Sequence, residues 1–550
     1  MKKRIIAILI GIFIVGILLR FYRLGDVPFG LHRDEAFLGY NAYSILETGK
    51  DMSGNFLPLH LKSFLFSPAL YSYFSAPFIK IFDLNAFSVR FASALFGSLT
   101  ILITYFLTRE LIRISKLRIS ANVLALLSSL LLAVSPWHIN LSRTATENAI
   151  VVFFIALGVL IYFLYLNINK WYLLILSFFC FFTTIFLYQA PRAFLPFFIP
   201  LLMLLFFNKN KKDFILKLLL FFAIIILPLF LIFNSRDLSL RIRTVSIFAT
   251  SGTQLMIDEQ IRTDGVFQTP VLLTRTFHNK FTMYTQQFLE NYFSHFSYSF
   301  LFSDKSFPDR YRVPLAGILY FLELPLIIVG IFRLTWENKK LLIFLFGWIL
   351  IVPLGSALTF DDIPNIQRTL IIFPALSIVE VFGLLQIIDF FRKNYWLKIL
   401  GTGLTLIFIY NIFFYIHQYY MHVSRYRPWY RQDGYKELVI KVNALLGENK
   451  KAVVTDRESA PTIFFLFYSK YSPSKFQKET KNTKMKDFDR ISFGQFEFSQ
   501  RECPLGEDKD GKIKKENGII FVNSGLCKEI IGVKETQIKR QDGSVAFRIY

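Results

Sequence analysis

The chain has 550 residues, of which 54% are hydrophobic and only 18% are charged, and its mean hydropathy is +0.44. Soluble globular proteins carry about 25% charged residues, so this composition excludes an ordinary soluble domain and predicts a membrane protein. The formal net charge of +23 comes from short basic runs between apolar blocks, which is typical of cytoplasmic loops and supplies no basic patch for nucleic acid.

About eleven apolar blocks approach the roughly 17–25 residues that a membrane-spanning helix needs. The blocks are 5–20, 86–107, 121–136, 149–168, 171–188, 194–208, 214–233, 313–333, 341–359, 369–390 and 397–416. The first follows Lys2-Lys3-Arg4 and lacks a small-residue cleavage site, so we interpret it as an uncleaved span. With the N-terminus cytoplasmic, the basic runs fall in the inner loops, and an odd number of spans places the C-terminal region outside.

Two of the predicted outer connections, 21–85 and 234–312, are too long for simple turns, and long loops usually carry function. In the first, Asp34–Thr48 has helical periodicity, and Gly49 is suited to end a helix. We expect an amphipathic helix on the outer surface of the bilayer. Its apolar face would consist of Phe37, Tyr40, Ala42 and Ile45.

The polar segment 417–550 is predicted to be an extracytoplasmic domain that follows a membrane module, 1–416. One helix and three strands are expected in it, at Tyr435–Leu446, Ala452–Thr455, Ile519–Asn523 and Val545–Tyr550. Cys503 and Cys527 could pair outside the cell, although the sequence does not show that they do. We therefore predict an all-α polytopic membrane protein with about eleven transmembrane helices, extracytoplasmic loops and a small C-terminal α/β domain.

Two adjacent carboxylates stand just after the first span, in His32-Arg33-Asp34-Glu35. Removing a proton from a hydroxyl or amine nucleophile takes one positioned carboxylate, and a neighbour of like charge raises its pKa toward a useful range. The structural alternative is helix capping, with Asp34 as the N-cap and Glu35 favoured by the helix dipole.

A second acid and four cations also fall in the predicted outer loops. They are Arg143, Glu147, Arg192, Lys62 and Arg368. Each has a structural alternative; Arg192, for instance, could simply reach the lipid headgroups. Together, a carboxylate base and several cations favour a reaction in which a nucleophile loses a proton and a phosphate leaving group gains charge.

These motifs resemble the GT-C superfamily of glycosyltransferases, in the branch that contains protein O-mannosyltransferases and lipid A aminoarabinose transferases. The matching pieces are Asp34-Glu35, Phe87-Ser88-Val89-Arg90, Ser142-Arg143 with Glu147, Tyr188 to Arg192, Asn291-Tyr292 through Phe300-Leu301-Phe302, and Pro364 to Arg368 with Pro374. One motif departs from the family, whose members carry Lys-Pro-Pro in the first loop, because Lys62 is followed here by Ser63-Phe64.

The resemblance implies a role for each candidate residue. Asp34 would be the base that acts on the acceptor, Glu35 its helper and Glu147 the acid of the second loop. Arg143 would contact the donor phosphate, and the further phosphate ligands would be Lys62, Arg192 and Arg368.

The resemblance also implies an inverting transfer of a sugar from a polyprenyl-phosphate donor to a lipid, glycan or protein acceptor at the outer face of the plasma membrane. No cofactor and no essential metal is implied, although Asp361-Asp362 leaves the question of a metal open. The main alternative is a transporter or lipid flippase, in which Glu323 and Glu380 would form an ion path rather than an interhelical contact. A non-catalytic scaffold or sensor, whose outer domain binds a partner, is the other alternative.

Overall fold

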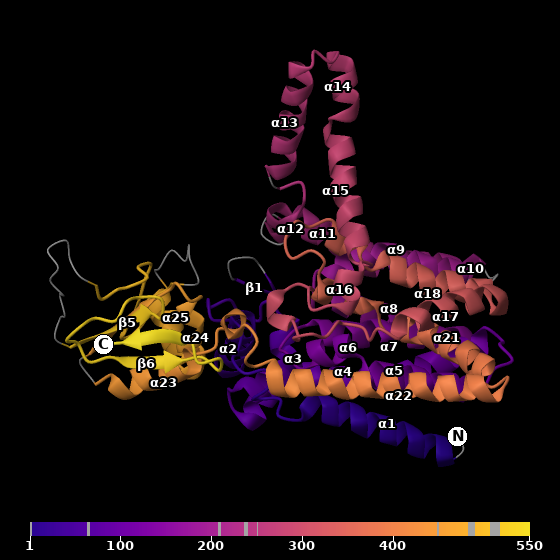
Figure 1. Ribbon diagram of the computed structural model, residues 1–550, viewed down its shortest axis with the longest axis horizontal. Helices are drawn as coiled ribbons and strands as arrows, with labels where there is room; N and C mark the ends of the chain where they lie inside the picture. Colours follow the sequence, from indigo (N-terminus) through magenta and orange to yellow (C-terminus); the bar gives the residue numbers. More distant parts are fainter. Residues whose placement is uncertain are drawn as a thin grey trace. The chain divides into compact units, whose positions relative to one another are not determined.

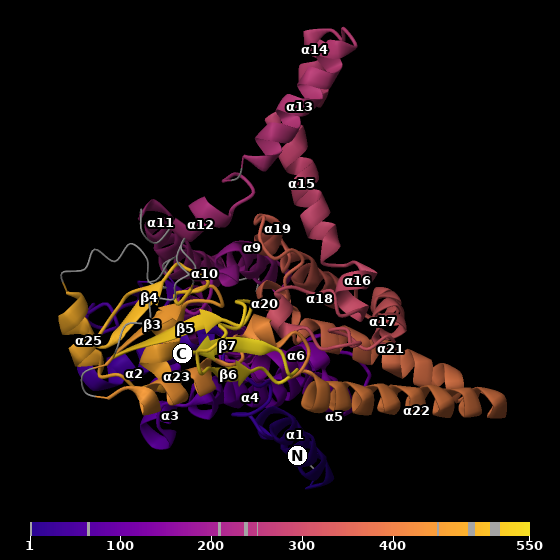
Figure 2. The ribbon, with the colours of Figure 1, turned by 60° about the vertical axis from the view of Figure 1, so that its left-hand side comes forward.

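The computed structural model describes residues 3–62, 67–206, 211–235, 240–249, 251–447, 450–481, 490–506 and 518–550. The chain forms two compact units, whose elements Figures 1 and 2 label. Unit 1 contains Met1–Leu19, Phe96–Leu141 and Glu147–Tyr415, and unit 2 contains Arg20–Leu95, Ser142–Thr146 and Ile416–Tyr550. The first long loop thus folds together with the C-terminal region, whereas the second folds with the apolar helices.

Most of the apolar helices belong to unit 1. Among the described residues, six stretches are long and apolar enough to cross a membrane: α1 (Lys3–Phe21), α4 (Ala86–Ile114), α7 (Asn148–Ile168), Lys212–Asn234, Lys339–Ala357 and Tyr395–His422. Two bent pairs also qualify when each is taken as one span, which raises the number to eight: α5 (Ala121–Val134) with α6 (Pro136–Ser142), and Ile366–Ile372 with α21 (Ala375–Phe391). Two apolar helices are shorter, α8 (Trp171–Ile185) and α9 (Ala190–Leu205). The protein is therefore a multi-pass membrane protein.

Several of these stretches consist of consecutive helical elements. These elements are α10 (Lys211–Leu220), η1 (Phe221–Ile226), α11 (Leu227–Asn234), α18 (Lys339–Ile351), α19 (Leu354–Ala357), α20 (Ile366–Thr369), η3 (Leu370–Ile372), α22 (Tyr395–His417) and η4 (Gln418–His422). The end of the predicted span 194–208 falls at residues 207 and 208, which lie outside the described part of the chain.

The predicted span 313–333 is wrong in its bounds. Residues 313–322 form turns, and the helix α17 runs only from Glu323 to Glu337. The Glu323 carboxylate accepts the backbone N–H of Tyr320 at 2.9 Å, which fastens the preceding turn to the first residue of the helix. α17 packs tightly on α21, because a Cβ on Gly330 would lie 2.1 Å from the Val379 carbonyl oxygen. Glycine at such a contact lets two membrane helices approach closely.

The second long loop, 234–312, forms a helical hairpin within unit 1. Its elements are α12 (Leu240–Val245), α13 (Gly252–Val266), α14 (Val271–Phe277), α15 (Lys280–Ser294), α16 (Tyr298–Phe302) and η2 (Asp309–Tyr311). We call residues 252–294 the helical arm. Figures 1 and 2 both show the arm projecting away from the other helices of its unit, transverse to α22.

The first long loop begins with the predicted helix, α2 (Arg33–Thr48), which Gly49 ends with φ at 69°. β1 (His60–Leu61), β2 (Ser67–Pro68) and α3 (Leu70–Phe82) follow. The expected position of α2 on the lipid surface is corrected, because protein covers the face that was expected to meet lipid. Tyr40 and Ala42 are fully buried, and the Tyr40 hydroxyl donates to the Tyr471 carbonyl oxygen at 2.8 Å.

The C-terminal region of unit 2 is a small α/β fold, as predicted. Its five-stranded sheet has the order β4-β3-β5-β7-β6, with β4, β3 and β5 parallel and the other pairs antiparallel. The strands are β3 (Lys451–Thr455), β4 (Phe496–Ser499), β5 (Ile519–Ser524), β6 (Thr536–Lys539) and β7 (Val545–Ile549), and the helical elements are η5 (Pro428–Arg431), α23 (Tyr435–Leu445), α24 (Pro461–Tyr468) and α25 (Pro473–Thr480). Cys503 and Cys527 form a disulfide. The sequence missed β4 and β6, which are only four residues long.

Candidate active site

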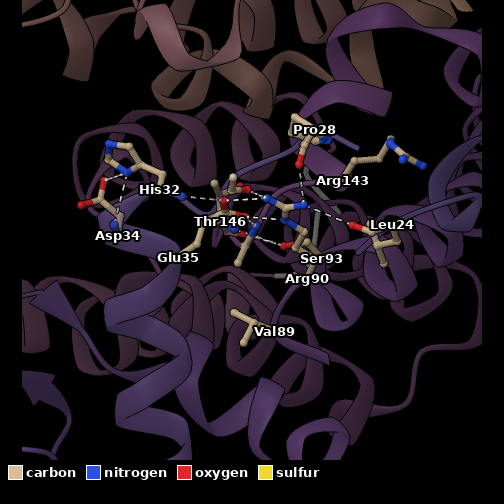
Figure 3. A network of polar contacts seen from close by, with 12 residues as sticks. Leu24, Pro28, His32, Asp34, Glu35, Val89, Arg90, Ser93, Arg143 and Thr146 are labelled. Carbon is tan, nitrogen blue, oxygen red and sulfur yellow. Dashed lines mark hydrogen bonds and ion pairs between the residues drawn. The ribbon is translucent and has the colours of Figure 1, made fainter. Parts of the chain in front are cut away.

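A buried arginine on α4 holds the first long loop around the start of α2 (Figure 3). The Nε and Nη2 atoms of Arg90 donate to the two carboxylate oxygens of Glu35 at 2.9 and 3.0 Å. Nη1 and Nη2 also donate to the carbonyl oxygens of Leu24, Pro28 and Gly30. All five N–H bonds of this fully buried guanidinium therefore have acceptors, which is what a buried charge requires.

The Glu35 carboxylate is the other centre of this network. It accepts the backbone N–H groups of Ala145 at 2.7 Å and of His32 at 3.2 Å. Burial pushes the pKa of Glu35 upward, but the charge and hydrogen bonds of Arg90 and these N–H groups outweigh burial, so the pKa lies below its ordinary value. These contacts give Glu35 a structural role, which ties α2 to α4 and to the Ser142–Thr146 segment. Its role as a helper in catalysis stays a prediction.

The neighbouring carboxylate, that of Asp34, has different surroundings. Its side chain is 55% exposed, and Figure 3 shows it at one end of the network, with Arg143 at the other. The N-cap of α2 is His32, whose Nδ1 accepts the Asp34 backbone N–H at 3.2 Å. The capping alternative for Asp34 is therefore corrected, because Asp34 is the second residue of the helix. The exposed Asp34 carboxylate lies 3.3 Å from His32 Nδ1 and 4.0 Å from Arg33 Nε, and its role as the base stays a prediction.

Arg143 is fully buried beside the network. Its Nη1 donates to the Arg20 carbonyl oxygen at 3.0 Å, and its Nη2 donates to those of Tyr22 and Val27 at 2.8 and 2.9 Å. The guanidinium carbon lies 4.7 Å from the centre of the Tyr420 ring, within the range of a cation–π interaction. In this geometry Arg143 anchors the beginning of the first loop. A phosphate contact would require these partners to change, and it stays a prediction.

Two other predicted site residues, Lys62 and Glu147, lie in different units, each directly next to a strand or helix. Lys62 is exposed directly after β1 in unit 2, and residues 63–66, which include Ser63-Phe64, lie outside the described part of the chain. Glu147 is half-buried immediately before α7 in unit 1. The next residue, Asn148, donates to the Gln367 carbonyl oxygen at 2.8 Å, which holds the start of α7 against the segment that carries Arg368.

A cavity of about 250 Å³ in unit 1 brings together Arg192 and Arg368, two of the four predicted phosphate ligands. Its lining consists of Tyr188, Gln189, Ala190, Arg192, Ala193, Phe233, Val245, Ser246, Phe248, Gly355, Leu358, Thr359 and Arg368. α9 begins at Ala190 on its wall, and a helix N-terminus carries a partial positive charge. Among the described lining residues there are two cations and no carboxylate, and most of the wall is apolar. This combination suits a lipid-linked phosphate.

Arg368 is held in place by polar contacts to a nearby turn. Its Nη1 donates to Thr359 Oγ1 at 2.6 Å and to the Asp361 carbonyl oxygen at 2.8 Å, and its Nη2 donates to Asp361 Oδ1 at 2.9 Å. Asn365 caps the short helix α20 through its side chain, which accepts the backbone N–H of Arg368 at 3.0 Å. The guanidinium therefore has a fixed direction at the cavity.

His295 supports the same turn from the end of the arm, and sequence reasoning did not single it out. Its Nε2 accepts the Asn365 backbone N–H at 3.2 Å, while Nδ1 lies 2.7 Å from the Asn291 carbonyl oxygen. Burial, together with the nearby charge of Arg368, lowers the pKa of His295 to about 4. A neutral imidazole that donates from Nδ1 and accepts at Nε2 fits these contacts.

A second, more polar cavity of about 230 Å³ lies within unit 2, between the first loop and the C-terminal region. Its polar lining includes Asn85, Gln432, Asp433, Glu437, Tyr468 and Lys470. The cavity is close to the start of α2, because Gln432 Oε1 accepts the Arg33 backbone N–H at 3.1 Å. Burial raises the pKa of Asp433 to about 6, so that this carboxyl changes charge near neutral pH. Carboxylate, amide and hydroxyl groups around a small cavity suit a hydroxyl-rich ligand.

Arg90 is the main residue whose role sequence reasoning missed, since it was noted only as part of a motif. A charged residue near the start of an apolar helix was the available signal, because such residues are expensive in a membrane and are usually paired. The two intramembrane acids of the transporter alternative, Glu323 and Glu380, are both buried. The Glu323 carboxylate accepts the Tyr320 N–H in the turn just before α17, which is a local contact and not the interhelical one that was expected, so the role of both acids stays a prediction.

Residues 67–233 match the family model described as Dolichyl-phosphate-mannose-protein mannosyltransferase, which covers less than a third of the chain. No curated protein sequence matches the chain. The oligosaccharyltransferase of Archaeoglobus fulgidus, solved with a tethered acceptor peptide, superposes with a TM-score of 0.51 at 13% identity, covering 84% of this chain and 63% of that one. The archaeal oligosaccharyltransferase AglB from Archaeoglobus fulgidus, in complex with an inhibitory peptide and a dolichol-phosphate, gives a TM-score of 0.50 at 13% identity, with 85% and 64% covered.

ArnT from Cupriavidus metallidurans, bound to undecaprenyl phosphate, gives a TM-score of 0.49 at 12% identity, with 99% and 97% covered. The chain spans slightly less than two thirds of the length of the oligosaccharyltransferases that it matches. These comparisons confirm the predicted resemblance: the chain has the fold of the GT-C glycosyltransferases. Within that class, its membrane helices between residues 67 and 233 are similar to those of the protein mannosyltransferases.

Proposed function

We propose that the protein is a membrane glycosyltransferase that moves a sugar from a polyprenyl-phosphate donor to an acceptor at the outer face of the cell membrane. The observation that carries the proposal is the cavity with two arginines and mostly apolar walls. A lipid-linked phosphate needs cations for its oxygens and apolar surface for its tail, and this cavity offers both. In the proposal Arg192 and Arg368 bind the donor phosphate, and Arg143 and Glu35 hold the first loop.

The reaction in this proposal is a single displacement. Asp34 accepts a proton from the acceptor hydroxyl or amine, whose oxygen or nitrogen forms a bond to the anomeric carbon. The bond between that carbon and the phosphate oxygen breaks, and the configuration at the carbon inverts. The growing charge on the phosphate is stabilised by Arg192 and Arg368. The donor must be linked to a lipid, because nucleotide sugars are not expected outside a cell.

The acceptor in this proposal enters the polar cavity of unit 2. The contact between Gln432 and the start of α2 supports this assignment, because it connects the cavity to the helix that carries Asp34. The disulfide between Cys503 and Cys527 supports an extracytoplasmic position for the same region, since disulfides persist in oxidising compartments. In the proposal Lys62 is a further phosphate ligand and Glu147 is the acid of the second loop, as the family resemblance implies.

Donor binding tests the proposal directly. Purified protein in nanodiscs is titrated with undecaprenyl phosphate, and Arg368→Lys is compared with the wild type. Lysine keeps the charge but loses the planar contacts, so binding is expected to weaken about tenfold or more. Arg392→Lys is the matched control, because Arg392 is exposed outside the cavity and its replacement should leave binding unchanged. Wild-type affinity in Arg368→Lys would exclude this cavity as the phosphate site.

A further inference from the structure

The tip of the helical arm exposes a cluster of large apolar side chains. Leu272 is 83% exposed and Phe281 is 80% exposed. We call the cluster the apolar tip; its other members are Val266, Phe267, Val271 and Phe277. Single exposed apolar residues are ordinary on a protein surface, but a cluster of this kind at the end of a projecting hairpin indicates a surface that is covered in use.

The root of the arm is attached to the end of a membrane span. The Asn291 side chain donates to the carbonyl oxygens of Ala357 and Thr359 at 3.1 and 3.0 Å. The Tyr292 hydroxyl donates to the Leu350 carbonyl oxygen at 2.8 Å. Since the apolar stretch Lys339–Ala357 ends at this point, the root of the arm lies at the boundary between hydrocarbon and water.

The direction of the arm then determines what lies beside it. The arm leaves this boundary transverse to α22, as both views show (Figures 1 and 2). Because α22 belongs to a stretch long enough to cross the bilayer, a direction transverse to it runs along the plane of the membrane. An amphipathic segment in this plane buries its apolar side chains at the boundary between headgroups and acyl chains.

We propose that residues 252–294 form an arm that lies along the bilayer surface, with the apolar tip inserted among the lipids. Two cations close to the tip agree with an interfacial position rather than a buried one, because Arg275 precedes Phe277, Lys280 precedes Phe281, and both can reach the headgroups. The tip is itself fastened, since His278 Nε2 lies 3.4 Å from Asp264 Oδ2 across the hairpin. The apolar side chains of the tip therefore contact lipids of the same bilayer that the transmembrane helices cross.

The arm is also connected to the cavity that contains Arg192 and Arg368. The ring of Tyr284 on α15 packs on that of Phe248, with the ring centres 4.9 Å apart, and Phe248 lines the cavity. On the proposed function, the arm therefore steadies one wall of the donor site from the membrane surface. The placement of the arm in lipid does not depend on that function.

Lipid contact is measured with an environment-sensitive fluorophore on single cysteines, in Cys180→Ser protein reconstituted into phosphatidylcholine vesicles. Leu272→Cys carries the label at the apolar tip, and Glu290→Cys carries it at an exposed polar position of the same arm as the matched control. Lipids brominated in the acyl chains should quench the label at residue 272 at least twofold more than the label at residue 290. Aqueous iodide should show the opposite order.

Equal access of iodide to both labels would overturn the proposal, because the apolar tip would then be in water. A crosslink between the residue 272 thiols of two copies, without quenching by brominated lipid, would also overturn it by identifying a second copy as the occupant. Phe281→Cys gives an independent second position, at which the same order is expected. If the protein transfers no sugar but the label at residue 272 is quenched as expected, the proposed function is refuted and the proposal that the arm lies in lipid still holds.

Discussion

Replacing Glu35 with glutamine is expected to destabilise unit 2 far more than the same change at Asp34. Glu35→Gln removes the counter-charge of Arg90, a fully buried guanidinium whose Nε and Nη2 both donate to this carboxylate. Breaking a buried ion pair by removing one partner costs about 3–5 kcal/mol. Asp34 is 55% exposed, and its replacement by asparagine loses a favourable position in the helix dipole, worth about 0.3–1 kcal/mol, together with solvent-exposed contacts to His32 and Arg33 that add little.

Thermal unfolding of the purified protein in nanodiscs measures this difference. For a cooperative unit of about 150–250 residues, each kcal/mol lowers the Tm by about 2–4 °C, so Glu35→Gln should lower it by roughly 6 °C or more. Asp34→Asn should shift it by no more than about 4 °C. Hydrogen exchange in peptides from residues 20–35 should rise in Glu35→Gln alone. Equal Tm values for the two variants would refute the account of Glu35 as the centre of a buried network.

Two further predictions concern unit 2. Because the folded-state pKa of Asp433 is raised to about 6 from an ordinary value near 3.8, its contribution to stability is present below pH 4 and is lost as the pH rises to about 6. Asp433→Asn should therefore gain stability relative to the wild type between pH 4 and pH 7, by up to about 3 kcal/mol in urea titrations, and a constant difference would contradict this assignment. Opening the Cys503–Cys527 bridge by Cys503→Ser with Cys527→Ser should cost about 3 kcal/mol, since the cysteines are 24 residues apart, and unchanged stability would show that the bridge contributes nothing.

The sequence predicted the fold class because membrane spans and short strands leave periodic or continuous apolar patterns. The helix α2, its glycine cap and three strands of the C-terminal sheet followed from such patterns. The block 313–333 did not, because hydropathy counts apolar residues and is insensitive to turns. The short strands β4 and β6 offer too few residues for a pattern to emerge.

The site was predictable in its residue types but not in the partners of each residue. Adjacent carboxylates look alike in a sequence, yet Asp34 is exposed whereas Glu35 is buried against Arg90. Arginines likewise look alike, although Arg143 donates to three backbone carbonyls, whereas Arg368 is paired with Asp361 at the wall of a cavity. Only tertiary packing decides which charges are used to hold a loop and which remain for a ligand.

The measurement that tests the central claim most directly is the release of polyprenyl phosphate from a panel of radiolabelled polyprenyl-phosphate sugars by cell membranes that contain the protein and the native acceptors. The wild type should release it from at least one donor in the panel, and Asp34→Asn should be slower by on the order of a hundredfold or more. Asp542→Asn, a change at an exposed acid elsewhere in unit 2, should match the wild type. Wild-type turnover by Asp34→Asn would contradict the assignment of the base, and an inactive wild type on every donor would contradict the proposed enzyme.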